Sequence, residues 1–271
     1  MASWSGGRTS SGRAFSHGDL PATDELLRRH DGRVACLILE PATLTDPPPG
    51  YLAGLRELAH RHSCVLVFDE MITGFRWSEA GAQSVYGVAP DLSTFGKALG
   101  NGFSVAALAG RRDLMELGGS RHGGEQVFLL STTHGAETHS LAAAMAVQRT
   151  YAEEGITARL HALGDRLADG MRAAAAGTGV EDHVLVRGRA SNLVFATLDE
   201  NLDPSQSYRT LAGGVLAPSF VVSAALTEDD IDRTVEVVAQ ACTVYRKALD
   251  ARDPTPWMGG RPVRPVFRRH A

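Results

Sequence analysis

The chain has 271 residues, of which 44% are hydrophobic, and a formal net charge of −4. This length and apolar content allow a sizeable core in one or two domains. The small net charge does not indicate nucleic acid or an anionic membrane as a partner, and no apolar run approaches the ~20 residues that cross a bilayer. We therefore expect a soluble cytoplasmic protein.

The cysteines and histidines indicate neither disulfides nor a metal site. Cys36, Cys64 and Cys242 are odd in number, widely spaced and set in apolar runs. This pattern predicts buried thiols. The histidines show no spacing typical of metal ligands, so we expect no bound metal.

The first half of the chain predicts alternating strands and helices after a flexible leader over residues 1–14. Residues 34–39 predict a buried strand that ends at Glu40-Pro41. A helix should follow, with these apolar residues on one face: Tyr51, Leu52, Leu55, Leu58 and Ala59. The next strand, 64–68, would carry Asp69 to its carboxyl end. Strand, helix and strand in this order predict a mainly parallel sheet whose ligands bind at the carboxyl ends of its strands.

The second half predicts a smaller α/β domain. A helix over 137–154, closed by Gly155, leads into a second helix, and we place the domain boundary near residue 150. Strands are expected over 193–197 and 220–224. A capping box over 227–230 should open a helix whose inward residues are Ile231, Val235, Val238, Cys242 and Tyr245. We thus expect a large domain over 15–150 and a small C-terminal domain over 151–271.

Two residues of complementary chemistry stand 28 positions apart. Asp69 follows the apolar run Val65–Phe68, and Lys97 lies in a turn framed by glycines. An enzyme that uses pyridoxal 5'-phosphate needs both, because a lysine amine forms a Schiff base with the cofactor and a carboxylate keeps the ring nitrogen protonated. The same lysine can then transfer a proton as general base and acid, a role that requires an uncharged amine.

A different class of enzyme also places an acid at the end of an apolar strand. In a P-loop ATPase this acid holds magnesium, and a phosphate-binding loop is needed as well. The candidate loop over residues 7–14 has the glycine spacing, but it has Arg13 and Ala14 where the motif requires Lys and Ser or Thr. A P-loop-type ATPase is therefore the remote alternative.

Several short motifs occur together in a fixed order along the chain. They are Glu40-Pro41, Asp69–Arg76, Gly81–Gln83, Gly87–Leu92, Gly96-Lys97, Gly100–Gly102 and Gly214–Ser219. With these motifs the chain resembles the class III (fold type I) pyridoxal-phosphate-dependent aminotransferases, most of all those of the glutamate-1-semialdehyde 2,1-aminomutase type. The resemblance covers most of the chain from about Phe15 onward.

The resemblance implies roles for four residues. Asp69 matches the acid on the ring nitrogen, Lys97 the Schiff-base lysine, and Met71 the apolar residue beneath the ring. Thr132 matches the threonine that reaches the cofactor phosphate of the neighbouring subunit, with Thr133 as the alternative if the alignment slips by one. The implied function is pyridoxal-phosphate-dependent amino-group transfer on a small amino or keto acid, by an aminotransferase or an aminomutase, in a homodimer with shared sites.

The chain also departs from the family pattern. Relatives have a long N-terminal half with a Gly/Ser-rich turn for the cofactor phosphate and an aromatic residue that stacks on the ring, and neither is found in this sequence. Thr43 and Thr45 follow Glu40-Pro41, where relatives often have Gln or Asn. We expect a truncated or split member that is completed by another chain, and a non-catalytic fragment is the alternative.

Overall fold

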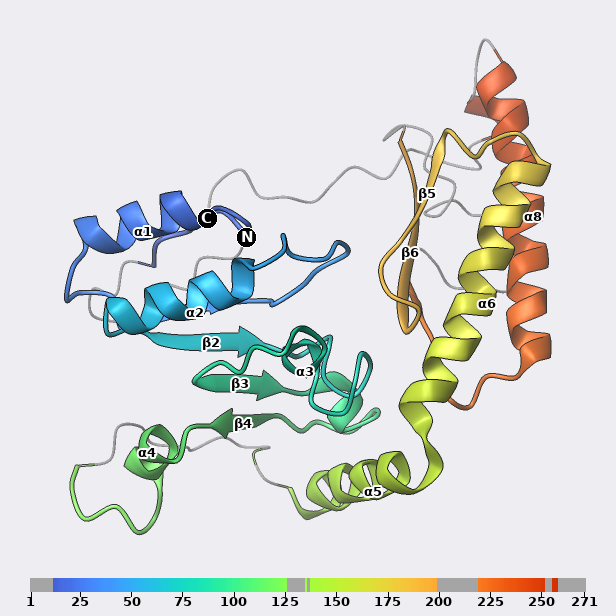
Figure 1. Ribbon diagram of the computed structural model, residues 1–271. Coiled ribbons are helices and arrows are strands. Elements are labelled where there is room, and N and C mark those ends of the chain that lie inside the picture. The colour runs from blue at the N-terminus through green and yellow to red at the C-terminus, as the bar shows by residue number, and fades with distance from the viewer. Residues whose placement is uncertain (1–11, 126–134, 136, 199–218, 252–254, 258–271) are drawn as a thin grey trace. The chain divides into compact units, whose positions relative to one another are not determined.

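The computed structural model describes residues 12–125, 135, 137–198, 219–251 and 255–257 (Figure 1). These residues form two compact units, and the division falls between Arg149 and Thr150. The leader predicted over residues 1–14 lies almost entirely outside the described residues.

The first unit contains a four-stranded sheet of order β1-β2-β3-β4. The strands are β1 Cys36–Leu39, β2 Val65–Asp69, β3 Leu92–Phe95 and β4 Ala107–Gly110. The pairs β1–β2 and β2–β3 are parallel, whereas β4 runs antiparallel to β3. The mainly parallel sheet is therefore as predicted, and Asp69 is the last residue of β2.

Helices α1 (Leu20–Arg29) and α2 (Tyr51–Arg61) lie on the same side of this sheet (Figure 1). The buried residues of α2 are the five that the sequence places on one face: Tyr51, Leu52, Leu55, Leu58 and Ala59. They pack with Leu37, Leu66 and Phe68 of the sheet into one apolar cluster. Helix α1 begins at a signal that sequence analysis overlooked, because Asp19 accepts a hydrogen bond from the Ala22 N–H at 2.9 Å.

Strand β1 corrects two expectations. The prediction of a buried strand over 34–39 is wrong in part, because β1 is a sheet edge on which Leu37 is buried but the Ile38 side chain is 54% exposed. The prediction of three buried thiols is wrong for Cys36, which is exposed, while Cys64 and Cys242 are buried. Both predictions assume that an apolar run has both faces covered, and β1 has only one face packed against helices.

Four short elements precede or follow strands of the first unit. They are α3 Ala82–Tyr86, the 3₁₀ turn η1 Lys97–Leu99, α4 Arg112–Met115 and the 3₁₀ turn η2 Glu116–Gly118. Helix α5 (Thr138–Glu154) crosses the division between the units and ends at Gly155, which has a left-handed φ of 61°. This end is where the sequence predicts it.

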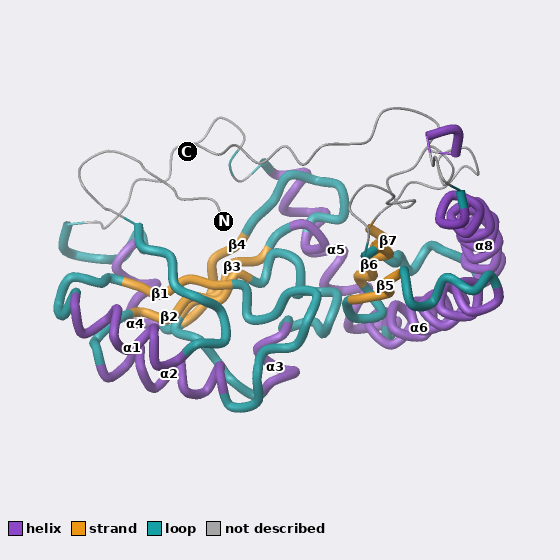
Figure 2. Tube along the Cα trace, turned by 90° about the horizontal axis from the view of Figure 1, so that it is seen from above, coloured by secondary structure: helices purple, strands orange, loops and turns teal. Residues whose placement is uncertain are grey.

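The second unit packs two long helices against a small antiparallel sheet, seen from above in Figure 2. The helices are α6 (Ile156–Gly177) and α8 (Glu228–Asp250), followed by the 3₁₀ turn η3 (Thr255–Trp257). The strands are β5 Val184–Arg187, β6 Asn192–Thr197 and β7 Ser219–Val221, in the order β5-β6-β7. The last strand is shorter than the predicted 220–224.

Helix α8 opens with the predicted capping box. The Thr227 hydroxyl accepts a hydrogen bond from the Asp230 N–H at 3.1 Å, and the Asp230 carboxylate accepts one from the Thr227 N–H at 2.8 Å. The predicted inward residues of α8 all contact the core of this unit. No helix in the described part of the chain is both long enough and apolar enough to span a membrane.

Candidate active site at the carboxyl edge of the first sheet

Asp69 is held at the carboxyl end of β2 by its neighbours. It is the register partner of Thr94 on β3, whose hydroxyl donates a hydrogen bond to Asp69 Oδ1 at 3.3 Å. The Met71 N–H donates to the same oxygen at 3.0 Å. None of the hydrogen bonds between described residues reaches Oδ2, so this oxygen is available to a ligand.

Lys97 lies just after the carboxyl end of the neighbouring strand β3. Gly96 separates it from the strand, and Lys97 opens the turn η1 with a left-handed φ of 47°. Its carbonyl accepts hydrogen bonds from the N–H groups of Gly100 and Asn101, both at 3.1 Å. Such a backbone conformation costs a non-glycine residue about 1–2 kcal/mol. The hydrogen bonds of the turn therefore hold Lys97 in a conformation that its own backbone disfavours.

The side chain of Lys97 is exposed, which differs from the buried amine that the proposed chemistry requires. The described residues of this chain leave Lys97 uncovered. At the same edge of the sheet, Asp69 and Met71 are both partly buried.

Met71 lies against the turn that presents Lys97. A Cβ atom at Gly96 would come within 2.3 Å of Met71 Cε and 2.7 Å of Met71 Sδ. Only a glycine at position 96 lets the thioether lie this close to the backbone. The structure thus brings Asp69, Met71 and Lys97 to one edge of the sheet.

Glu40 is a fourth residue at this edge, and sequence analysis assigned it no role. It follows β1, whose Leu39 is the register partner of Phe68, so Glu40 is next to the position of Asp69. Desolvation of the Glu40 carboxyl group and the nearby Asp69 carboxylate raise the pKa of Glu40, while Lys97 and His17 act in the opposite direction. The usable signal was the position of Glu40-Pro41 at the end of a strand parallel to the one that carries Asp69.

The remaining predicted site residue cannot be placed. Thr132 and its alternative Thr133 lie outside the described residues, as does most of the candidate phosphate loop over 7–14. Their assignments stay predictions.

Solved structures identify the class of fold. A transaminase with PLP bound matches with a TM-score of 0.78 at 22% identity, over 86% of this chain and 57% of that chain. An omega-transaminase from Sphaerobacter thermophilus matches with a TM-score of 0.75 at 24% identity, over 84% of this chain and 56% of that one. The fold is that of the fold type I transaminases, as predicted.

Sequence comparison identifies the family. The model of the family "Aminotransferase class-III" matches residues 19–240. The chain therefore belongs to the class-III aminotransferases. This membership leaves the P-loop ATPase alternative without support.

Two curated relatives are glutamate-1-semialdehyde 2,1-aminomutases. The one from Desulforudis audaxviator is 35% identical over 248 residues, which cover 82% of this chain and 55% of the relative. The one from Thermomicrobium roseum is 34% identical over 245 residues, which cover 83% of this chain and 56% of the relative. The chain thus spans about half the length of these relatives.

Proposed function

We propose that this chain supplies the ring-binding part of a pyridoxal 5'-phosphate site to a cytoplasmic enzyme of amino-group transfer. The observation that carries the proposal is the placement of Asp69, Met71 and Lys97 together at the carboxyl edge of β2 and β3. The enzyme is an aminotransferase or an aminomutase of the glutamate-1-semialdehyde type, and its substrate is a small amino or keto acid. Family membership and the two aminomutase relatives support this function.

The residues at this edge fit the ring end of the cofactor. The unused Oδ2 of Asp69 is an acceptor for a protonated ring nitrogen, and the Met71 thioether offers an apolar, polarisable surface for the ring. Because Gly96 has no Cβ atom, the Met71 thioether lies directly against the backbone of the residue that precedes Lys97. Thr132 is the proposed contact of the phosphate end.

Each residue has a distinct task in the reaction. Bound pyridoxal phosphate supplies an electron sink for the carbon that carries the amino group. Asp69 would hold the proton on the ring nitrogen, and Thr94 would keep the Asp69 carboxylate oriented. Met71 would pack against the ring and exclude water from one face. Lys97 Nζ would bind the cofactor and then accept and return the proton at the reacting carbon.

We also propose that a further polypeptide completes the site, either a second copy of this chain or a complementing chain. The exposed Lys97 side chain supports this proposal, because the proposed chemistry needs a lysine that is shielded from water. Exposed apolar side chains at both edges of the first sheet support it as well, with 54% of Ile38 and 44% of Leu108 accessible.

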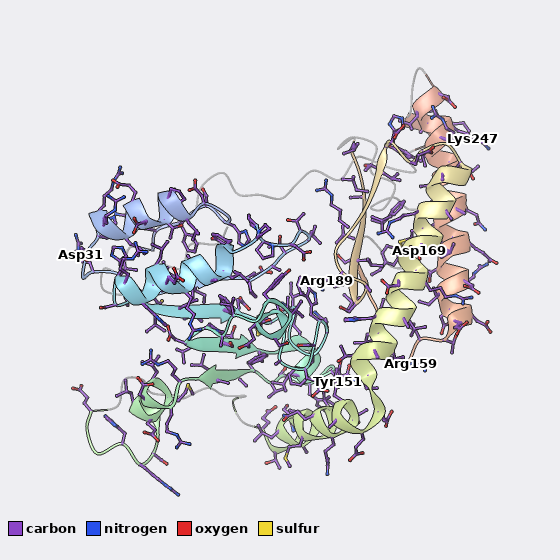
Figure 3. The ribbon with its side chains drawn as sticks, in the orientation of Figure 1. Asp31, Tyr151, Arg159, Asp169, Arg189 and Lys247 are labelled. Atoms are coloured by element: carbon purple, nitrogen blue, oxygen red, sulfur yellow. The ribbon has the colours of Figure 1, made fainter. Side chains whose placement is uncertain are left out.

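The lysine content of the chain allows a direct test of cofactor attachment. The sequence has two lysines, Lys97 and Lys247. Lys247 lies near the end of α8, 5.8 Å from the centroid of the Trp257 ring, and serves as the internal control (Figure 3). The chain should be mixed with pyridoxal phosphate, reduced with borohydride and analysed by peptide mass spectrometry.

We expect the pyridoxyl group on Lys97, with Lys247 modified only at cofactor concentrations that label any exposed amine. A Lys97→Arg variant should lose the label, whereas Lys247→Arg should keep it. Equal labelling of the two lysines would contradict a specific cofactor-binding site at Lys97 and would favour a non-catalytic fragment.

Subunit mixing tests completion by a second copy. A Lys97→Ala chain and a Thr132→Ala chain should each be inactive alone. If the active sites are shared between two copies, mixing the two variants should restore up to about a quarter of the parent activity, because one of the two sites in a mixed dimer is intact. Absence of any recovery, with dimers present by light scattering, would favour a separate complementing chain.

A further inference from the structure

Directly after Asp69 the chain places a second acid, Glu70, whose side chain is fully buried (0% exposed). A buried carboxylate loses its hydration and must be held by hydrogen bonds. Burial raises the pKa of Glu70, and hydrogen bonds from Thr73, Gln83 and Ala82 act against this rise. The chain therefore keeps a carboxyl group whose burial costs folding free energy, one residue after Asp69 of the proposed site.

The Glu70 carboxylate joins two segments that are separate in sequence. Its Oε2 accepts hydrogen bonds from the Thr73 hydroxyl and from the Ala82 N–H, the latter at 2.7 Å. Its Oε1 accepts one from the Gln83 N–H at 2.8 Å. Thr73 belongs to the turn after β2, and the two amides open α3. One side chain thus ties the end of β2 to the start of α3.

Gly81 leaves room for the Glu70 carboxylate because it has no side chain. Its φ is 80°, and a Cβ atom there would come within 2.2 Å of Glu70 Oε2. A larger residue at position 81 would be strained and would also displace the carboxylate.

The backbone of Glu70 is held as firmly as its side chain. Its N–H donates to the Thr94 carbonyl at 3.0 Å, and its carbonyl accepts a hydrogen bond from the Gly74 N–H at 2.8 Å. Thr94 is the residue whose hydroxyl holds the Asp69 carboxylate, and the turn 71–74 includes Met71. Any shift of Glu70 would therefore move both ring-contacting residues.

We propose that Glu70 is a positioning residue for the cofactor ring: its buried carboxylate fixes the β2 end and the turn 71–74, and so sets the places of Asp69 and Met71. This proposal rests on the proposed function for its consequence. The positioning itself is a property of the chain without cofactor.

Asp91 provides a matched control at the other end of the same strand. It is also buried (4% exposed), and it accepts a hydrogen bond from the Leu66 N–H of β2 at 2.8 Å. Further bonds link it to Arg111 and His60. Loss of either carboxylate should destabilise the fold, but only Glu70 adjoins Asp69 and Met71.

The test compares Glu70→Gln and Asp91→Asn with the parent in two measurements. The first is amide hydrogen exchange of Met71 and Gly74 in the protein without cofactor. The second is the dissociation constant for pyridoxal phosphate, measured well below the melting temperature. The side-chain amide introduced by Glu70→Gln would present a donor to N–H groups that need acceptors, so it cannot replace all the bonds of the carboxylate.

For Glu70→Gln we expect exchange at Met71 and Gly74 to accelerate at least about tenfold, because the local hydrogen-bonded turn opens more often. We expect the dissociation constant to rise by about tenfold or more, since small displacements of binding groups are costly. Asp91→Asn should lower the melting temperature and leave both measurements within about twofold of the parent.

The outcomes separate this proposal from the proposed function. Unchanged exchange in Glu70→Gln, or an equal effect of Asp91→Asn, would overturn the positioning role. A parent that does not bind pyridoxal phosphate would count against the proposed function, while the exchange measurement would still decide on Glu70. If Glu70→Gln does not fold, Thr73→Val removes one donor to the same carboxylate and should accelerate the same two amides by a smaller factor.

Discussion

Thr94 and Asp69 are register partners on adjacent parallel strands, and the Thr94 hydroxyl donates a hydrogen bond to Asp69 Oδ1 at 3.3 Å. Together with the Met71 N–H at 3.0 Å, it occupies one carboxylate oxygen and leaves the other for a ligand. The strand pairing therefore does more than place an acid at the sheet edge: it also determines which oxygen the acid presents.

Replacement of Asp69 tests the task assigned to this oxygen. In Asp69→Asn the amide still accepts the Met71 N–H but cannot hold a proton on a ring nitrogen. We expect kcat to fall by about 10²-fold or more. The lost hydrogen bond is the one between the Asp69 carboxylate and the protonated ring nitrogen, whose positive charge the reaction depends on. Steady-state turnover of the complete enzyme is the measurement. Thr94→Val is the matched control and should cost less than about tenfold, since it removes only an orienting hydrogen bond.

The contact between Gly96 and Met71 can be tested by unfolding. In Gly96→Ala the added methyl group collides with Met71, and we expect a loss of roughly 1–3 kcal/mol in the free energy of unfolding. Combination with Met71→Ala should recover part of this loss, because the colliding atoms are then absent. Gly177→Ala is the control: it has open space around it at the end of α6 and should change stability by less than about 1 kcal/mol. Additive effects of Gly96→Ala and Met71→Ala would argue against the contact.

Asp91 gives a prediction about pH. Burial alone would raise the pKa of Asp91, but hydrogen bonds from Leu66, Arg111 and His60 outweigh it and hold the pKa below its ordinary value. A lowered pKa in the folded state means that the ionised group adds stability above the ordinary aspartate value, about 3.9, and that this stability is lost as the pH falls through the lower folded value.

The difference in unfolding free energy between the parent and Asp91→Asn should therefore be constant near neutrality and shrink as the pH falls below about 4. Chemical denaturation across this range measures it. A difference that stays the same down to the lowest pH at which the parent is folded would show that folding does not lower the pKa of Asp91.

The capping box of α8 gives a prediction for the second unit. Thr227→Ala removes the acceptor for the Asp230 N–H, and we expect a loss of about 1 kcal/mol in the free energy of unfolding. Thr243→Ala is the control on the same helix. Its hydroxyl only bonds back to the Ala239 carbonyl, so this variant should be neutral or slightly stabilised. Equal losses in the two variants would contradict the capping role.

Sequence reasoning succeeded where the local pattern determines the structure. The apolar spacing of α2 predicted its buried face residue by residue, and the Thr227 to Asp230 spacing predicted a cap that forms both of its hydrogen bonds. Asp69 could be placed at the carboxyl end of its strand because an apolar run that ends in an acid has few other interpretations in a parallel sheet.

Sequence reasoning failed where the burial or the bonding of a residue depends on which parts of the chain the fold brings next to it. The run that contains Cys36 and Ile38 is as apolar as a central strand, yet it forms the edge strand of the described sheet, and both of these residues are exposed. The task of Glu70 was also invisible, because its three partners are brought to it by the fold of the chain between Thr73 and Gln83. Sequence distance does not reveal such bonds.

The left-handed backbone at Lys97 has a consequence for engineering. Glycine adopts a φ of 47° without the cost borne by lysine, so Lys97→Gly should make the chain harder to unfold while removing the amine that the proposed reaction depends on. A screen that ranks variants by melting temperature would therefore favour an inactive chain at this position. Here thermal stability and activity should be scored separately.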